Sequence, residues 1–404
     1  MLKRSRSLLA ATAAVSTVVM AAATIPAGAA EDEIQVGVVT TLTTPASVIG
    51  REVQDAMTLA LEQMGGTIAG KPVRLIFEDD GLKPDVGRQK TEKLVRQDEV
   101  DFITGYIWSN VLLASRRAAL DADTFLISAN AAPSDMAGKL CDPDFFSMRG
   151  QGDVMSMALG EELNKRGVKK IYTMAPNYAA GKDVVAGLLR TYKGEVVGQD
   201  FTKWGDDPQL DFSAEFAKVR ASGAEALFAF YPGRASAFMT QFEQAGLKDP
   251  TELFTVYTID NIALPNLQKG NVTGALGSSL VDYWYPALET EENTRFVAAF
   301  QQKYERLPSN YAAAAYDVLP LIKSAVEAAG GDLADRDAVR KGLEAADFAS
   351  VRGKLVFGVN HMPLDNYYAL DVEAGADGTW GVVSKGLVLE RGADPYAAEC
   401  KMGS

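Results

Sequence analysis

The sequence predicts an α/β fold made of two successive series of parallel strands and helices. Short apolar runs alternate with segments whose apolar residues recur at helical spacing, a pattern typical of a parallel sheet covered by helices. One series spans residues 34 to about 149, and a second begins at about residue 171. The length of 404 residues supports two domains, because it exceeds what one hydrophobic core usually holds.

The first series contains four predicted strands. Residues 34–39 form the first strand, and residues 51–64 form an amphipathic helix behind it. Pro84 begins a second helix, where its missing N–H is tolerated and its fixed φ angle suits the first turn. The other strands are expected at 72–77, 102–105 and 125–128.

The second series follows a segment at 145–152 that is extended at first and contains two glycines. A helix is expected at about 153–166. The strands of this series are expected at 171–174, 226–230 and 253–257, with late strands at 355–357 and 367–372. Beyond residue 286 the pattern becomes helical, with helices expected at 293–305, 310–329 and 335–346.

The late helices have no strands between them to cover, so we place them on the first lobe. The expected domains are lobe 1 at 31–149 plus 286–355, lobe 2 at 150–285 plus 356–390, and a C-terminal tail at 391–404. This path crosses between the lobes about three times. Two doubly wound β/α lobes joined by a three-segment hinge would enclose a cleft.

Residues 1–30 are predicted to be a signal peptide. Lys3, Arg4 and Arg6 form a basic start, residues 8–25 are small and apolar, and residues 26–30 offer a small-residue cleavage site. No later apolar run approaches the roughly 20 residues that a membrane helix needs. We therefore expect a soluble protein exported to the periplasm.

The charge of the chain argues against two classes of partner. Its net charge is −13, whereas binding to nucleic acid or to an anionic membrane rests on basic patches. We expect neither a nucleic-acid partner nor insertion into a membrane.

The chain has two cysteines, Cys141 and Cys400. In an oxidising compartment such a pair is readily bridged, and the bridge would fasten the C-terminal tail to lobe 1. Two free buried thiols are the alternative.

Catalytic and metal-binding residues are scarce. His361 is the one histidine, and we interpret it as a hydrogen-bonding turn residue; a catalytic base or metal ligand is the weaker alternative. The sequence has no serine-nucleophile elbow, phosphate-binding loop, dinucleotide fingerprint or zinc-ligand spacing. We expect a protein that is not an enzyme and that needs no cofactor or metal; a hydrolase is the weaker alternative.

Candidate ligand-binding residues are concentrated in the stretch 102–136, which contains two strand–loop–helix units. The loops that leave the carboxyl ends of parallel strands line the ligand crevice of such sheets. These two loops carry Trp108, Ser109, Asn110 and Asn130. The helix after Ser109 also turns free N–H groups toward the crevice, which favours an anionic ligand group.

The second lobe offers aromatic and polar candidates at its own strand ends. Tyr178, Tyr231 and Tyr283 each supply a large apolar face and one hydrogen-bond donor. Asp260 is a further polar candidate. Arg234 begins a helix, where a cation is disfavoured unless an anion offsets it, so it is a candidate partner for a ligand carboxylate. A solvent-exposed arginine is the alternative.

Several motifs, in this order along the mature chain, resemble the type I periplasmic solute-binding proteins that serve ABC transporters. They are Val36–Thr40 with Gly50, Asp79–Asp80 with Pro84, Ile127–Ala131, Ala175–Asp183, Pro308–Ala313 with Tyr316–Asp317, and Val351–Gly353. The resemblance implies a Venus-flytrap fold that closes on a ligand and docks on a membrane permease. It also places ligand contacts on the Ser109 loop, Asn130, Ala131, Ala132, Tyr178, Tyr231 and the Asp260 region.

Within that group, the chain looks more like the aromatic-acid binders than the leucine binders. Leucine-binding members have a tyrosine where this chain has Ile49, and small hydroxyl residues where it has Trp108, Ser109 and Asn110. The pair Cys141 and Cys400 also suits the aromatic-acid subgroup. We expect a monomeric binding component of an ABC importer for a small carboxylate-bearing, aromatic or hydrophobic solute. The alternatives are a free-standing ligand sensor, or transport of an aliphatic branched-chain amino acid or amide.

Overall fold

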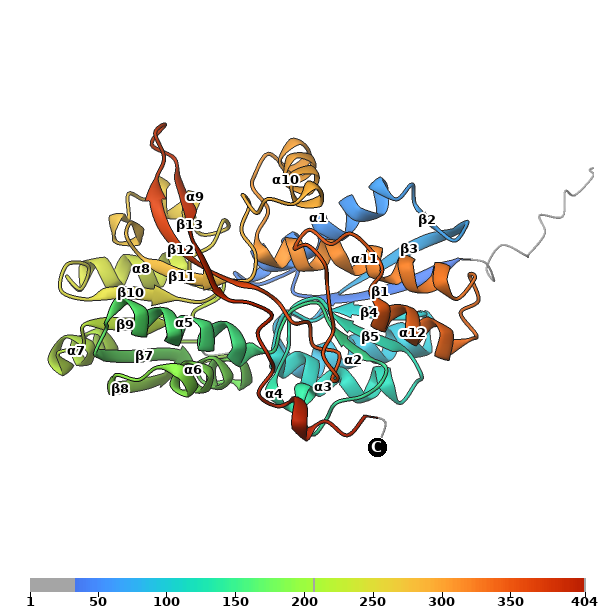
Figure 1. Ribbon diagram of the computed structural model, residues 1–404, viewed down its shortest axis with the longest axis horizontal. Helices are drawn as coiled ribbons and strands as arrows, with labels where there is room; N and C mark the ends of the chain where they lie inside the picture. Colours follow the sequence, from blue (N-terminus) through green and yellow to red (C-terminus); the bar gives the residue numbers. More distant parts are fainter. Residues whose placement is uncertain (1–32, 206–207, 403–404) are drawn as a thin grey trace, which may run out of the picture.

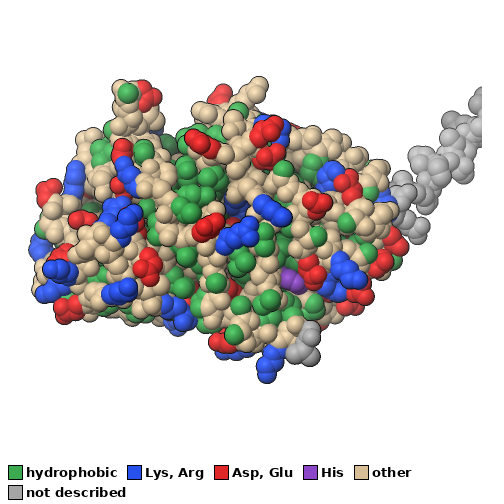
Figure 2. All heavy atoms as spheres, in the orientation of Figure 1, with side chains coloured by type: hydrophobic (Ala, Val, Ile, Leu, Met, Phe, Trp, Pro, Cys, Tyr) green, Lys and Arg blue, Asp and Glu red, His purple; other side chains and the backbone are tan. Residues whose placement is uncertain are grey.

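The chain folds into two lobes, each built on a mostly parallel sheet with helices packed against it (Figure 1). The computed structural model describes residues 33–205 and 208–402, so the predicted signal peptide lies outside the described residues. The predicted two-lobe α/β fold of the Venus-flytrap type is confirmed. Acidic and basic side chains are interspersed over both lobes on the face shown in Figure 2.

The sheet of the first lobe has six strands in the order β2-β3-β1-β4-β5-β6. All neighbouring strands pair in parallel except β2 and β3. Strands β4, β5 and β6 are buried along their whole length, which is why they are continuous apolar runs. The strands are β1 Ile34–Thr40, β2 Thr67–Ile68, β3 Lys71–Asp79, β4 Phe102–Gly105, β5 Phe125–Ser128 and β6 Phe145–Ser147.

Seven helices accompany this sheet. Four connect its strands: α1 Ser47–Gln63, α2 Pro84–Arg96, α3 Ser109–Leu120 and α4 Ser134–Ala137. Three come late in the chain: α10 Glu291–Tyr304, α11 Asn310–Ala328 and α12 Arg336–Ala345. Helix α11 packs against α1 and α12. Ser309 caps α11 by accepting a hydrogen bond from the N–H of Ala312, at 3.3 Å.

The sheet of the second lobe has seven strands in the order β13-β12-β11-β10-β9-β7-β8. Strand β12 pairs antiparallel with both β11 and β13, and the other pairs are parallel. The strands are β7 Lys170–Pro176, β8 Glu195–Thr202, β9 Ala226–Ala229, β10 Glu252–Thr255, β11 Ser279–Asp282, β12 Tyr367–Ala374 and β13 Trp380–Leu389. The helices are α5 Gly152–Arg166, α6 Ala179–Thr191, α7 Ser213–Ser222, α8 Ala235–Gln244 and α9 Leu264–Lys269.

One predicted strand is wrong, and strands β2, β6, β8, β11 and β13 were not predicted. Residues 355–357 form no strand; Phe357 makes only an isolated bridge to Pro363. The segment is a short run between two glycines and lies where the chain passes from α12 to β12. Strands β8 and β13 were missed because each lies at a sheet edge and mixes polar with apolar residues.

Three segments cross between the lobes, after β6, after β11 and after α12. Asp365, in the third crossing, accepts a hydrogen bond from the N–H of Gly150 at 2.9 Å and pairs with Nη1 of Arg352 at 3.0 Å. The first and third crossings are therefore joined to each other. The exact division of the crossings between the two lobes stays a prediction.

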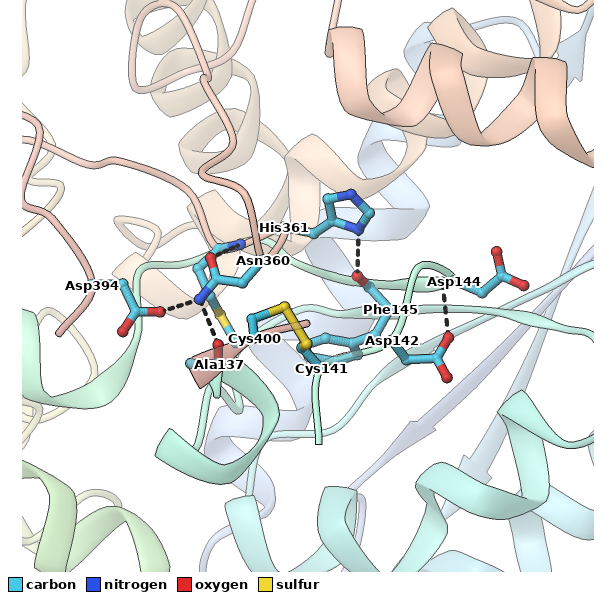
Figure 3. The surroundings of a disulfide bond; sticks show 10 residues. Ala137, Cys141, Asp142, Asp144, Phe145, Asn360, His361, Asp394 and Cys400 are labelled. Carbon is cyan, nitrogen blue, oxygen red and sulfur yellow. Dashed lines mark hydrogen bonds between the residues drawn. A yellow bond between two sulfur atoms is a disulfide. The ribbon is translucent and has the colours of Figure 1, made fainter. Parts of the chain in front are cut away.

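The C-terminal tail leaves β13 and returns to the first lobe (Figure 1). Cys400 and Cys141 form a disulfide there, with Cα atoms 5.6 Å apart, so the free-thiol alternative is not adopted (Figure 3). Beside the bridge, Asn360 donates to the carbonyl of Ala137 at 2.7 Å, and Nδ1 of His361 lies 3.1 Å from the carbonyl oxygen of Phe145. His361 thus holds a turn against lobe 1.

Candidate ligand-binding site

A cavity lies between the two lobes, beyond the carboxyl ends of strands from both sheets. It contains about 330 Å³ of space between the atoms. We call it the inter-lobe cavity. The first lobe contributes Ile107, Trp108, Ser109, Asn130, Ala131 and Ala132 to its lining. Tyr178, Phe230 and Tyr257 of the second lobe, Arg149 of the first crossing and Tyr311 of α11 also line it, among others.

The first-lobe wall begins with a sharp turn at the end of β4. Gly105 has a φ of 99°, and a Cβ there would lie 2.1 Å from the carbonyl oxygen of Val39, so a side chain is excluded. The turn leads to Trp108, which is almost fully buried. Its indole N–H donates to Oγ1 of Thr41 at 2.8 Å, and the Thr41 hydroxyl donates to Asp80 at 2.6 Å. This chain of hydrogen bonds fixes the plane of the indole.

Two helices begin beside the cavity, one from each lobe. Trp108 is the N-cap of α3 and Tyr178 is the N-cap of α6, and neither helix has a side-chain cap. Uncapped N–H groups and the helix dipole both favour an anion at such an end. The two helix starts therefore add positive potential to the cavity from opposite sides.

The second-lobe wall is aromatic. The rings of Tyr178 and Phe230 are nearly parallel, with centroids 6.2 Å apart, and Tyr257 meets Phe230 edge-on. Trp204, in the loop after β8, stacks on Tyr178 at 4.6 Å and lies 5.2 Å from the Trp108 ring of the other lobe. Trp204 was not among the predicted residues, although it links the aromatic groups of the two lobes.

Arg149 is the cationic residue of the cavity, and it comes from the first crossing. Its side chain is buried, with 6% of the residue exposed, and its guanidinium carbon lies 4.5 Å from the centre of the Tyr257 ring. Among the described residues it forms no ion pair with an acidic side chain, and its Nε has no acceptor. A guanidinium keeps its proton at any physiological pH. The cavity therefore contains a buried positive charge that no described acidic side chain meets in an ion pair, although Asp282 and Asp365 interact with it at longer range.

Six of the eleven predicted ligand-binding residues line the inter-lobe cavity: Trp108, Ser109, Asn130, Ala131, Ala132 and Tyr178. Asn110, Tyr231, Arg234, Asp260 and Tyr283 do not. Tyr231 instead packs in the core of lobe 2 against Phe238, at 4.8 Å. The Tyr283 hydroxyl donates to the carbonyl of Asn310 at 2.7 Å, in the second crossing. A ligand-binding role for any of the eleven stays a proposal.

Arg234 and Asp260 line a separate space, which we call the outer pocket, with about 790 Å³ between its atoms. It also contacts both lobes, because Ile49 of α1 lines it from the first lobe. Asp260 accepts hydrogen bonds from the N–H groups of Ile262 and Ala263 at 3.0 and 2.8 Å. Burial raises the pKa of Asp260 to about 7. Burial lowers the pKa of Arg234, which pairs with no acid among the described residues.

A direct hydrogen-bonded contact between the lobes lies next to the cavity. Asp183 of α6 accepts hydrogen bonds from the N–H and the hydroxyl of Ser134, at 3.0 and 2.8 Å. Burial raises the pKa of Asp183 to about 6, and the neighbouring charges of Asp153 and Asp135 act in the same direction. The lobes are therefore in contact in this structure, and the contact involves a group that titrates near neutral pH.

Within residues 33–205 and 208–402, no cluster of His, Cys, Asp and Glu could hold a metal ion. In the same ranges no helix is long and apolar enough to cross a membrane.

Comparisons with known proteins agree on the family. A model of the periplasmic binding protein family matches residues 33–378. Two solved solute-binding proteins of ABC transporters, both 25% identical to this chain, superpose on it. One, from R. palustris in complex with benzoate, has a TM-score of 0.84 and covers 91% of this chain and 99% of its own. The other, from Rhodopseudomonas palustris BisB5 in complex with 3,4-dihydroxybenzoic acid, has a TM-score of 0.81 and covers 90% of this chain and 99% of its own. A Leu/Ile/Val-binding protein homolog of Brucella melitensis is 25% identical over 81% of this chain and 88% of its own length. The chain belongs to the periplasmic binding protein family and has the fold of its type I members.

Proposed function

We propose that the protein is the periplasmic substrate-binding component of an ABC importer. Its lobes would close on a small carboxylate-bearing, aromatic or hydrophobic solute and present it to the permease subunits, with the protein acting as an exported monomer. Family membership and the likeness to ABC solute-binding proteins support the transport role. The chemistry of the inter-lobe cavity supports the choice of solute.

The unpaired charge of Arg149 is the observation that carries the proposal. Burying an isolated cation is costly, and arginine cannot lose its proton to avoid that cost. A ligand carboxylate would supply the missing negative charge through charge-assisted hydrogen bonds, which are about twice as strong as neutral ones. The uncapped N-termini of α3 and α6 favour an anion in the same cavity.

The aromatic walls support a flat or apolar body for the solute. Trp108, Tyr178, Phe230 and Tyr257 all line the cavity, and aromatic side chains prefer to stack on, or meet edge-on, other rings. The cavity is narrow in this structure, so the lobes have to move apart to admit a solute.

Calorimetry with a panel of acids tests the proposal. We expect benzoates or hydroxycinnamates to bind with micromolar affinity, about −8 kcal/mol, and leucine to bind more weakly. In a parallel thermal-shift assay, ligand at 100 times its dissociation constant should add about 2.7 kcal/mol to the free energy of unfolding. Binding of leucine alone would contradict the choice of an aromatic solute.

An aliphatic amino acid is the second candidate, and the outer pocket favours it. Arg234 and Asp260 provide one basic and one acidic group around the same space, as an α-carboxylate and an α-amino group would require. The Leu/Ile/Val-binding homologues agree with this possibility. The leucine arm of the titration separates the two candidates, because Arg234→Ala should reduce leucine binding only if the outer pocket holds the amino acid.

A further inference from the structure

The C-terminal tail runs from β13 of lobe 2 to lobe 1 and is fastened at both ends. It follows β13 directly, and the disulfide joins Cys400 to Cys141 of lobe 1. Between these points, Asp394 accepts a hydrogen bond from Nδ2 of Asn360 (Figure 3). The turn that contains Asn360 is itself held to lobe 1, because the same nitrogen donates to a carbonyl of α4. Asp394 is therefore attached to lobe 1.

Two residues further along, the tail contacts lobe 2. The Tyr396 hydroxyl accepts a hydrogen bond from Nη2 of Arg190 in α6, at 2.9 Å, and donates one to Asp153 in α5, at 3.1 Å. The guanidinium carbon of Arg190 also lies 5.0 Å from the centre of the Tyr396 ring. Two residues of chain span at most about 7 Å. The lobes therefore cannot separate at this place without breaking the contact at Asp394 or the contact at Tyr396.

The direct hydrogen-bonded contact between the lobes involves two of the same helices. Asp183 of α6 accepts the hydrogen bonds from Ser134, the first residue of α4. Ala137, whose carbonyl accepts from the turn that holds the tail, is the last residue of α4. Opening of the lobes next to the inter-lobe cavity moves α6 away from α4, and this is the motion that the tail opposes.

We propose that the tail, closed by the disulfide between Cys141 and Cys400, is a fourth connection between the lobes and restricts their opening. The three crossings form the hinge, and the tail acts beside them as a strap. The disulfide keeps the tail at lobe 1 when the hydrogen bond of Asp394 breaks, so the contacts can re-form within the molecule. The strap goes beyond the proposed function, because it does not depend on which solute is bound.

Hydrogen exchange of the full mature protein without ligand, followed by NMR, tests the strap. The N–H of Ser134 is protected by a bond to the other lobe, so its exchange rate reports the opening of the lobes. The N–H of Ala129 donates to the carbonyl of Gly105 at 2.9 Å, within lobe 1, and reports unfolding instead. We expect Tyr396→Phe to accelerate exchange at Ser134 about fivefold, because the strap loses its hydrogen bonds to lobe 2. Exchange at Ala129 should not change.

Tyr172→Phe is the matched control. The Tyr172 hydroxyl donates to Asp200 at 2.7 Å, and both residues belong to lobe 2, so this bond does not resist the opening of the lobes. We expect exchange at Ser134 to be the same in this variant as in the wild type.

The double variant Cys141→Ser/Cys400→Ser releases the tail from lobe 1 and should accelerate exchange at Ser134 at least as much as Tyr396→Phe does. Unchanged exchange at Ser134 in either variant would overturn the proposal, as would an equal acceleration in the tyrosine control. Equal acceleration at Ser134 and Ala129 would also overturn it, because the tail would then stabilise the fold as a whole. If the double variant does not fold, Tyr396→Phe and its control decide alone.

Discussion

Two buried arginines, Arg149 in the cavity and Arg352 in the hinge, have opposite surroundings. Arg352 pairs with Asp317 at 3.4 Å and with Asp365 at 3.0 Å, and so its charge is neutralised within the chain. Arg149 faces the ring of Tyr257 and pairs with no acid in the described part of the chain. Arg352 therefore stabilises the fold, and we propose that Arg149 is available to a ligand.

The buried acid Asp282, in the same region, differs from Arg149 in its ability to become neutral. Burial raises the pKa of Asp282 to about 8, so this group can become neutral by binding a proton. Asp282 also accepts hydrogen bonds from the neutral donors Tyr283 N–H and Asn310 Nδ2. Arg149 cannot become neutral in this way, because the pKa of a guanidinium lies far above any physiological pH. Asp282 and Asp365 interact with the charge of Arg149 only at longer range, and we propose that a ligand carboxylate pairs with it directly.

Replacing Arg352, the arginine of the hinge, should produce the largest change in the free energy of unfolding. Arg352→Met leaves Asp317 and Asp365 without their cation, and breaking a buried pair from one side costs about 3–5 kcal/mol. We expect chemical denaturation of the ligand-free protein to show that loss. A change below about 1 kcal/mol, the range of an exposed ion pair, would mean that the two arginines do not differ as described.

Replacing Arg149, the arginine of the inter-lobe cavity, should change the affinity for the ligand and not the stability of the protein. Arg149→Gln removes the proposed partner of the carboxylate, a loss of about 2–5 kcal/mol in binding free energy, or thirtyfold or more in affinity. The melting temperature should stay level or rise, because an unpaired buried charge is removed. Calorimetry and thermal unfolding of the same sample check both results. Full affinity in this variant would refute the role given to Arg149.

The ring contact between the lobes should have a smaller effect. Trp204→Ala removes the stack on Tyr178 and the contact with Trp108, which together are worth about 1 kcal/mol, or roughly fivefold in affinity. We expect most of this loss as faster ligand dissociation in stopped-flow fluorescence. Trp380→Phe, in β13, is the control and should leave the dissociation rate unchanged.

The last expected effect is a change in the pH dependence of stability. In the folded protein the pKa of Asp183 is raised from its usual value of 3.8 to about 6, so the folded state binds this proton more tightly than the unfolded state. Asp183 therefore lowers the free energy of unfolding as the pH rises from about 4 to about 6, and adds no further slope above that. Asp183→Asn should flatten melting temperature against pH in that window. Parallel curves for the two proteins would show that Asp183 titrates normally.

Much of the fold could be predicted because parallel sheets bury their strands on both faces. Such strands are continuous apolar runs, as in β4 and β5, and the residues that follow them reach the cleft. This rule located Trp108 and Asn130. It cannot tell whether an aromatic residue after a strand turns to the cleft or to the core, and Tyr231 turns to the core.

Arg149 was missed for a specific reason. Residues 145–147 were interpreted as a short extended run, whereas they form β6 at the edge of the first sheet. Had this run been counted as a strand, Arg149 would have stood just beyond its carboxyl end, the position that predicted Trp108. Asp260 was predicted to contact the ligand, but its carboxylate accepts hydrogen bonds from the N–H groups of Ile262 and Ala263. These bonds depend on the local turn, which the position of a residue after a strand does not predict.

The most direct test of the role of Arg149 compares one solute with its uncharged analogue. Calorimetry of the wild-type protein with 4-hydroxybenzoate and 4-hydroxybenzamide changes the charge of the ligand and little else. We expect the carboxylate to bind with micromolar affinity and the amide to bind at least thirtyfold more weakly, since only the carboxylate neutralises the buried guanidinium. Equal affinity for the two compounds would contradict the claim that an unpaired buried charge selects the ligand.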